Sequence, residues 1–70
     1  MEESLFIIPT LAQNDNSQRI EQYIRNLQGV LSIQIDAPNN TLYIRHFRSL
    51  TRRELSRSLS KLGFPERVTV

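Results

Sequence analysis

The chain has 70 residues, of which 39% are apolar and 23% charged, so we expect one small domain over residues 1–70. It contains no cysteine, which excludes disulfides, thiolate metal sites and thiol nucleophiles. The longest apolar run is Leu5–Ile8, far short of the roughly 20 residues of a membrane span. The acidic start, Met-Glu-Glu, is unlike a secretory signal, so a cytoplasmic location is expected, or the cytoplasmic face of a membrane for part of a transporter.

The first half of the chain predicts a strand followed by a helix. Leu5–Ile8 is β-branched and aromatic, and Pro9 ends it. A polar loop follows, in which Asp15, Asn16 or Ser17 can cap a helix start. Apolar residues then recur at helical spacing at Ile20, Ile24 and Leu27. Gly29 stands where a left-handed helix end is expected.

The second half predicts a hairpin, a second helix and a last strand. Val30–Asp36 alternates, residues 37–40 are typical of a turn, and Thr41–Phe47 is the partner strand. Ser49 or Thr51 opens a helix with an apolar stripe, and Gly63 ends it; the stripe is Leu55, Leu59 and Leu62. Arg67–Val70 predicts a short strand.

The order β-α-β-β-α-β is typical of the ferredoxin-like fold of the α+β class. Right-handed crossovers predict a four-stranded antiparallel sheet in the order 4-1-3-2, with both helices on one face. Alternation sends one set of apolar side chains toward the helices: Phe6, Ile8, Ile33, Ile35, Leu42 and Ile44.

In register with this pattern, the chain resembles the heavy-metal-associated domain family, which includes copper chaperones and N-terminal domains of metal-transporting P-type ATPases. The resemblance rests on the junction Leu27-Gln28-Gly29-Val30, on the late Gly63-Phe64, and on Ile20 and Ile24, four and eight residues after Asn16. Leu11 falls at the methionine of the family loop. The resemblance implies the family's scaffold and a protein partner.

The family's two metal-binding cysteines correspond here to Gln13 and Asn16. Cu(I) prefers thiolate or thioether ligands, so we expect no resident metal and no cofactor. Asn14, Asp15 and Asn16 offer oxygen ligands, which leaves weak, non-thiolate metal binding as an alternative. His46 is the only imidazole, and a lone histidine is expected at the core or its rim.

Catalysis is not expected. The first loop has neither the arginine nor the glycine of a phosphate-binding loop, and the one histidine leaves a general base scarce. The only adjacent carboxylates are Glu2 and Glu3, at the chain end.

Positive charge is concentrated in residues 45–61, which carry a net charge of +5 against −3 for residues 1–44. The cations of this basic stretch are Arg45, Arg48, Arg52, Arg53, Arg57 and Lys61. Three of them follow helical spacing opposite the leucine stripe. The stretch predicts attraction to an acidic protein surface, with a merely solvated helix face and nucleic acid as the alternatives.

Alternation also predicts an apolar patch on the sheet face away from the helices, formed by Leu5, Ile7, Tyr43 and Phe47. Such a patch is typical of a partner or self-association surface. The aromatic pair on one strand, with Arg45 between, keeps single-stranded RNA as an alternative, although the aromatic RNA-binding signature is absent. The leading hypothesis is a protein-interaction or regulatory module, with the N-terminus of a P-type metal ATPase as one setting.

Overall fold

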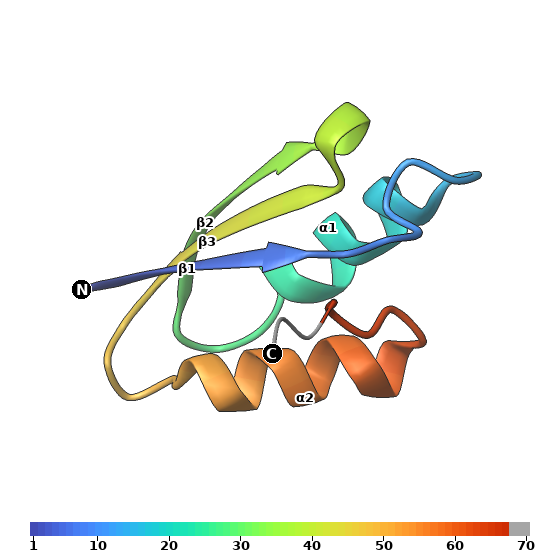
Figure 1. Cartoon of the computed structure of the whole chain (residues 1–70). Coiled ribbons are helices and arrows are strands. Elements are labelled where there is room, and N and C mark those ends of the chain that lie inside the picture. Colours follow the sequence, from blue (N-terminus) through green and yellow to red (C-terminus); the bar gives the residue numbers. More distant parts are fainter. Residues whose placement is uncertain (68–70) are drawn as a thin grey trace.

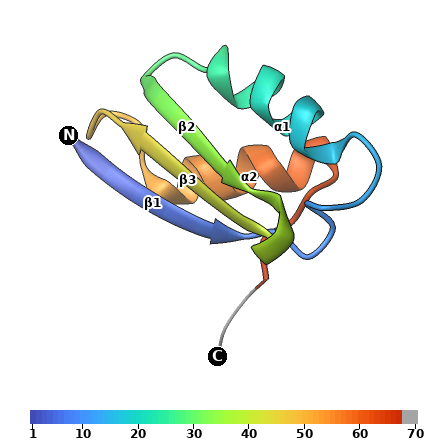
Figure 2. The same ribbon diagram turned by 90° about the horizontal axis from the view of Figure 1, so that it is seen from above.

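The computed structural model describes residues 1–67 and arranges them as a sheet covered on one face by two helices (Figures 1 and 2). In chain order the elements are β1 (Glu2–Ile7), α1 (Asn16–Arg25), β2 (Val30–Asp36), the 3₁₀ turn η1 (Ala37–Asn39), β3 (Thr41–His46) and α2 (Arg52–Leu62). The predicted α+β architecture with antiparallel strands is confirmed. No helix within these residues is long and apolar enough to cross a membrane.

The sheet has three strands in residues 1–67, in the order β1-β3-β2, rather than the four predicted. Of the predicted last strand, residues 68–70 lie outside the described part. Arg67 donates its amide to the Ile7 carbonyl at 2.7 Å, as a strand beside β1 would begin. The Leu5 carbonyl on the same strand instead accepts from the Arg52 guanidinium at 2.8 Å. A side chain thus takes a backbone acceptor that a fourth strand could have used.

The core lies between the sheet and the helices and contains most of the predicted apolar positions, with Ile33 and Ile35 packed against it but only half-buried. The side chains that are fully covered are Phe6, Ile8, Ile20, Ile24, Leu42, Ile44, Leu55 and Leu59. Leu11 and Phe64 also belong to the core and are 1% and 4% exposed. Because these residues come from every helix and from β1 and β3, their burial fixes the helices against the sheet.

His46 lies in the core, as predicted, at 1% exposed. Its Nδ1 is 3.0 Å from the Phe47 carbonyl oxygen, and its Nε2 is 2.8 Å from the Ser4 hydroxyl. A carbonyl can only accept, so Nδ1 donates to Phe47, while Nε2 is hydrogen-bonded to the Ser4 hydroxyl, which can donate or accept. Both ring nitrogens are therefore satisfied, and the side chain has a structural role.

The helix ends follow the sequence signals in α2 more closely than in α1. Thr51 caps α2, its hydroxyl oxygen accepting from the Glu54 amide at 3.1 Å, and Gly63 ends it with φ +101°. Asp15 precedes α1 without a side-chain capping bond. Gly29 has the left-handed φ expected of it, but it lies in the turn after α1, whose C-cap is Asn26.

A β-bulge interrupts the alternation predicted for Val30–Asp36. The register pairs Val30 with His46 and Ser32 with Arg45, so Leu31 is an extra residue. Leu31 is consequently 45% exposed, whereas unbroken alternation would have turned it toward the helices with Ile33.

Candidate functional site

The loop between β1 and α1 is the segment that the sequence resemblance aligns with a metal-binding loop, and a buried amide closes it. Asn16, at the second cysteine position, is 8% exposed and donates from Nδ2 to the Thr10 carbonyl at 2.7 Å. Leu11 is 1% exposed, and its amide donates to the Ile8 carbonyl at 3.0 Å. The Asn16 bond therefore closes the loop on itself, and the Leu11 side chain anchors it in the core.

The remaining polar residues of the loop point outward. Gln13, Asn14 and Asp15 are exposed, and Asn14 adopts a left-handed φ of +50°. Throughout residues 1–67, no three or more His, Asp or Glu side chains gather as a metal site. The loop therefore offers one carboxylate and dispersed amides, a poor set of ligands for either soft or hard cations.

Replacing Asn16 with alanine is expected to lower the free energy of unfolding by about 1–2 kcal/mol, because the Thr10 carbonyl loses a donor in a partly buried place. Urea denaturation of the purified chain measures this change. Gln13→Ala is the matched control on the exposed side of the loop and should stay within about 0.5 kcal/mol. Equal losses in both variants would show that the Asn16 amide does not hold the loop.

The six cations of the basic stretch do not form one surface. Arg45 projects from the open face of the sheet, which is the face away from the helices, and its guanidinium contacts the Met1 sulfur at 3.3 Å. Arg48 lies near the start of β1, beside Glu2. Arg48 shares a hollow with Arg52, whereas Arg45 lies on the sheet face away from α2.

Arg52 is held by three contacts with the body of the protein. It forms a two-point ion pair with Glu66 at 2.8 and 3.0 Å, and donates to the Leu5 carbonyl at 2.8 Å. Its guanidinium lies 4.4 Å from the centroid of the Phe6 ring. The ion pair raises the pKa of Arg52 and lowers that of Glu66. Sequence reasoning missed this contact because no local spacing relates residues 14 apart.

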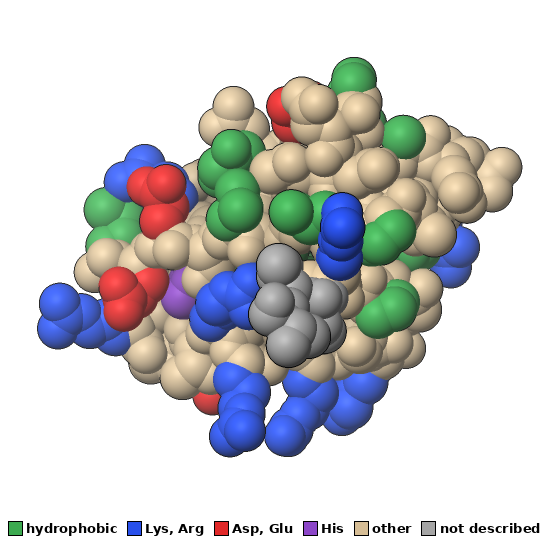
Figure 3. Space-filling view, in the orientation of Figure 1, with side chains coloured by type: hydrophobic (Ala, Val, Ile, Leu, Met, Phe, Trp, Pro, Cys, Tyr) green, Lys and Arg blue, Asp and Glu red, His purple; other side chains and the backbone are tan. Residues whose placement is uncertain are grey.

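The remaining three cations form a row along the exposed side of α2, which we call the α2 ridge: Arg53, Arg57 and Lys61. Four-residue spacing places them on one flank. Blue side chains gather along the lower edge of the space-filling view, over α2 (Figure 3). Among residues 1–67, no carboxylate lies within ion-pair distance of any of them.

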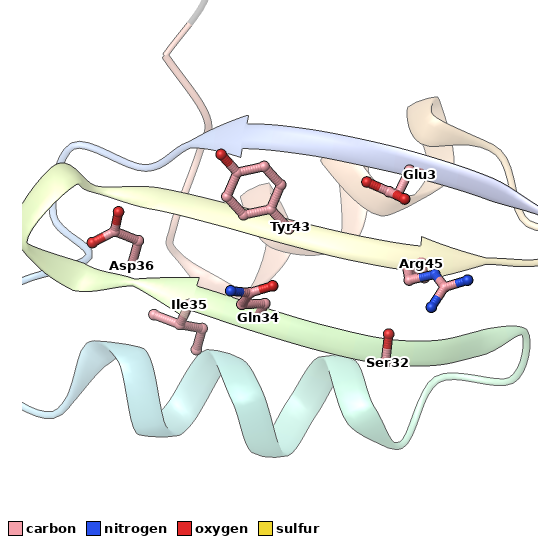
Figure 4. Close-up of a pocket in the computed structure, with 7 residues that line it drawn as sticks. All are labelled: Glu3, Ser32, Gln34, Ile35, Asp36, Tyr43 and Arg45. Carbon is pink, nitrogen blue, oxygen red and sulfur yellow. The ribbon is translucent and has the colours of Figure 1, made fainter.

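The open face carries a smaller apolar patch than predicted. Leu5 and Tyr43 are direct cross-strand partners, 44% and 40% exposed, with the half-buried Ile7 beside them. Next to them is a shallow hollow (Figure 4), lined by Glu3, Ser32, Gln34, Ile35, Asp36, Tyr43 and Arg45. Polar and charged side chains thus border the patch on the β2 side.

Phe47 does not join this patch. Its amide donates to the Gly29 carbonyl at 2.9 Å, and its ring, 53% exposed, lies near Leu50 and Glu54 at the far end of the sheet. Tyr43 and Phe47 line different hollows, so the two aromatic rings do not form a continuous stacking surface.

Comparison with solved structures shows what fold this is. The crystal structure of oxidized MerP from Ralstonia metallidurans CH34 aligns with a TM-score of 0.84 at 13% identity, covering 99% of this chain and 97% of that one. The solution structure of the Atx1–Cu(I)–Ccc2a complex aligns with a TM-score of 0.85 at 16% identity, covering 100% of this chain and 97% of that one.

A structure described as "Crosstalk between Cu(I) and Zn(II) homeostasis" aligns with a TM-score of 0.85 at 17% sequence identity, covering 99% of this chain and 100% of that one. No family model and no curated protein sequence matches the chain. The likeness therefore concerns the backbone and the element order, as the residue-level resemblance predicted. The chain has the heavy-metal-associated fold and carries no cysteine in it.

Proposed function

We propose that the chain is a non-enzymatic protein-interaction module that uses the α2 ridge to dock an acidic protein surface. The observation that carries the proposal is the row of three exposed cations without a carboxylate in ion-pair distance among the described residues. A single-sign row raises the local potential, and this steers an acidic partner toward it. Arg52 supports the ridge from the adjacent position by holding α2 against β1.

The comparisons give this role a context. One similar structure is a complex of Atx1, Cu(I) and Ccc2a, so a domain of this fold is found there bound to a protein partner. In this chain Asn16 closes the loop and no thiolate is present, so we assign the interaction to protein surfaces alone. The setting we propose is metal transport on the cytoplasmic side, as a free module or at the N-terminus of a P-type metal ATPase.

The test compares partner capture by wild type and by a ridge variant with Arg53→Gln, Arg57→Gln and Lys61→Gln. A control variant with Gln18→Glu, Gln22→Glu and Gln34→Glu has the same net charge, but its changes lie off α2. Proteins cross-linked in cells to each chain are identified and then purified for direct binding. An acidic partner should bind wild type and control alike and the ridge variant at least about tenfold more weakly.

Equal weakening in both variants would show that overall charge, and not the ridge, governs binding. Binding to the wild type should also weaken as salt rises from about 50 to about 300 mM, because the ridge is exposed to screening.

Two other hypotheses make different predictions. Weak metal binding would appear in calorimetric titrations with Cu(I), Zn²⁺ and Co²⁺, and dissociation constants at or below about 1 µM would contradict a metal-free module. Nucleic-acid binding would appear as a steep salt dependence with a labelled oligo-uridine. The separation of Phe47 from Tyr43 argues for little base stacking on the open face.

A further inference from the structure

The two edges of the sheet differ in what covers them. On the β1 edge, the Leu5 carbonyl accepts from Arg52 at 2.8 Å and the Ile7 carbonyl from the Arg67 amide at 2.7 Å. On the β2 edge, no strand lies alongside within residues 1–67. One edge is therefore occupied by contacts from within the chain, and the other is open to a further strand.

Beyond the bulge at Leu31, the β2 edge carries few of the features that discourage strand addition. At seven residues, β2 is the longest described strand, and Ser32–Ile35 contains neither a charge nor a proline. Ile33 and Ile35 are half-buried, whereas their partners on β3, Ile44 and Leu42, are fully covered. A strand beside β2 would cover the exposed part of both isoleucines and pair the outward backbone groups.

Helix α1 limits what can lie there. It runs beyond the β2 edge of the sheet in both views that look onto the sheet (Figures 2 and 4). Between the two lies a hollow of about 300 Å³, the β2 groove, lined by Arg25, Val30, Leu31, Ser32 and Ile33. A second copy whose β2 paired antiparallel with this one would place its own α1 on the same side of the sheet. Adjacent strands lie about 4.8 Å apart, whereas packed helices need about 8–10 Å between their axes, so the two α1 helices would collide.

We propose that the β2 groove binds one extended peptide segment of a partner protein, added as a strand to β2. The groove selects a segment with apolar side chains at alternate positions, which face α1, and with a carboxylate opposite Arg25. The Arg25 side chain is 67% exposed and lines the groove. One of its five N–H donors bonds Glu21 through Nη2, so the guanidinium has further donors to offer a carboxylate. This site lies apart from the α2 ridge and does not depend on the function proposed for it.

A display library of random peptides of about 12 residues, selected on the purified chain, supplies the probes. The expected selection is for alternating β-branched or aromatic residues with an acidic residue at one end. Binding should shift the ¹⁵N–¹H resonances of residues 30–36 more than those of residues 53–61. No selection above an unrelated protein, or shifts confined to the α2 ridge, would overturn the proposal.

Backbone methylation of a selected peptide tests strand pairing without changing the protein. Only every second residue of a strand directs its N–H toward its neighbour. N-methylation at one alternate set should therefore weaken binding at least about tenfold, and at the other set should leave it near unchanged. Equal effects of both sets would show that the peptide does not bind as a strand.

A charge exchange tests the assignment of Arg25. Arg25→Glu should weaken binding of the acidic peptide and strengthen binding of the same peptide with lysine at the acidic position. The α2 ridge variant should bind the acidic peptide as tightly as the wild type does. Sedimentation of the free chain at several concentrations tests the second copy as occupant. If the free chain is a dimer and peptide binding dissociates it, the natural occupant of the groove is a second copy, and the assignment to a partner peptide is wrong.

Discussion

A variant with Gln13→Cys and Asn16→Cys is expected to bind Cu(I) at least about a thousandfold more tightly than the wild-type chain, because two thiolates supply both the soft donors and the charge that amides lack. The scaffold around these positions is already in place. Residue 16 begins α1, where the helix N-terminus lowers a thiol pKa, and Leu11 anchors the preceding turn. Competition with a chelator of known Cu(I) affinity, under reducing conditions, measures the gain.

The metal-free double variant should be less stable than wild type, because Asn16→Cys removes the bond to the Thr10 carbonyl. Cu(I) should then raise its denaturation midpoint, since a ligand that binds only the folded chain stabilises it. The single variants Gln13→Cys and Asn16→Cys are the controls, and neither should approach the affinity of the pair. If the double variant folds and still binds no Cu(I), loss of the cysteines is not what distinguishes this loop.

Arg52→Ala is expected to lower the free energy of unfolding by about 2 kcal/mol, from the loss of charged hydrogen bonds and of the cation–π contact. The guanidinium bonds Glu66 and the Leu5 carbonyl and lies over the Phe6 ring. Because the Arg52 side chain is 51% exposed, its ion pair contributes less than a buried one would. Urea denaturation near neutral pH measures the loss.

Two variants separate the parts of this effect. Arg52→Met keeps an unbranched stem over Phe6 and removes the charge, so it should recover part of the loss. Arg53→Ala, one position along α2 and exposed, should stay within about 0.5 kcal/mol. Equal losses from Arg52→Ala and Arg53→Ala would show that the contacts of Arg52 contribute nothing beyond those of a surface cation.

The Arg52–Glu66 pair also predicts how stability depends on pH. The hydrogen bond from Arg52 lowers the pKa of Glu66 below its ordinary value of 4.5, against the opposing effect of burial. A carboxyl whose pKa is lower in the folded state contributes stability above the unfolded pKa, and that stability is lost as pH falls through the folded pKa. Acid titration of the unfolding free energy should therefore show a steeper fall below pH 4.5 in wild type than in Glu66→Gln.

The sequence by itself was enough to predict most of the fold. Helical spacing at Ile20, Ile24 and Leu27 and at the leucines of α2 identified the faces that pack on the sheet, and turn chemistry separated β2 from β3. These signals are local, because a helix repeats every 3.6 residues and a strand every two, whatever lies elsewhere in the chain. The absence of cysteine likewise excludes thiolate ligands from composition alone, because no arrangement of the chain can supply a missing sulfur.

Tertiary structure decided which residues share a surface. The basic stretch is continuous in sequence, yet a strand, a turn and a helix send Arg45, Arg48 and the α2 ridge to different places. Only the packed structure brings Glu66 to Arg52, and only the bulge at Leu31 exposes that side chain. The open edge of β2 also depends on which strands pair, a property of contacts between distant segments that local periodicity does not encode.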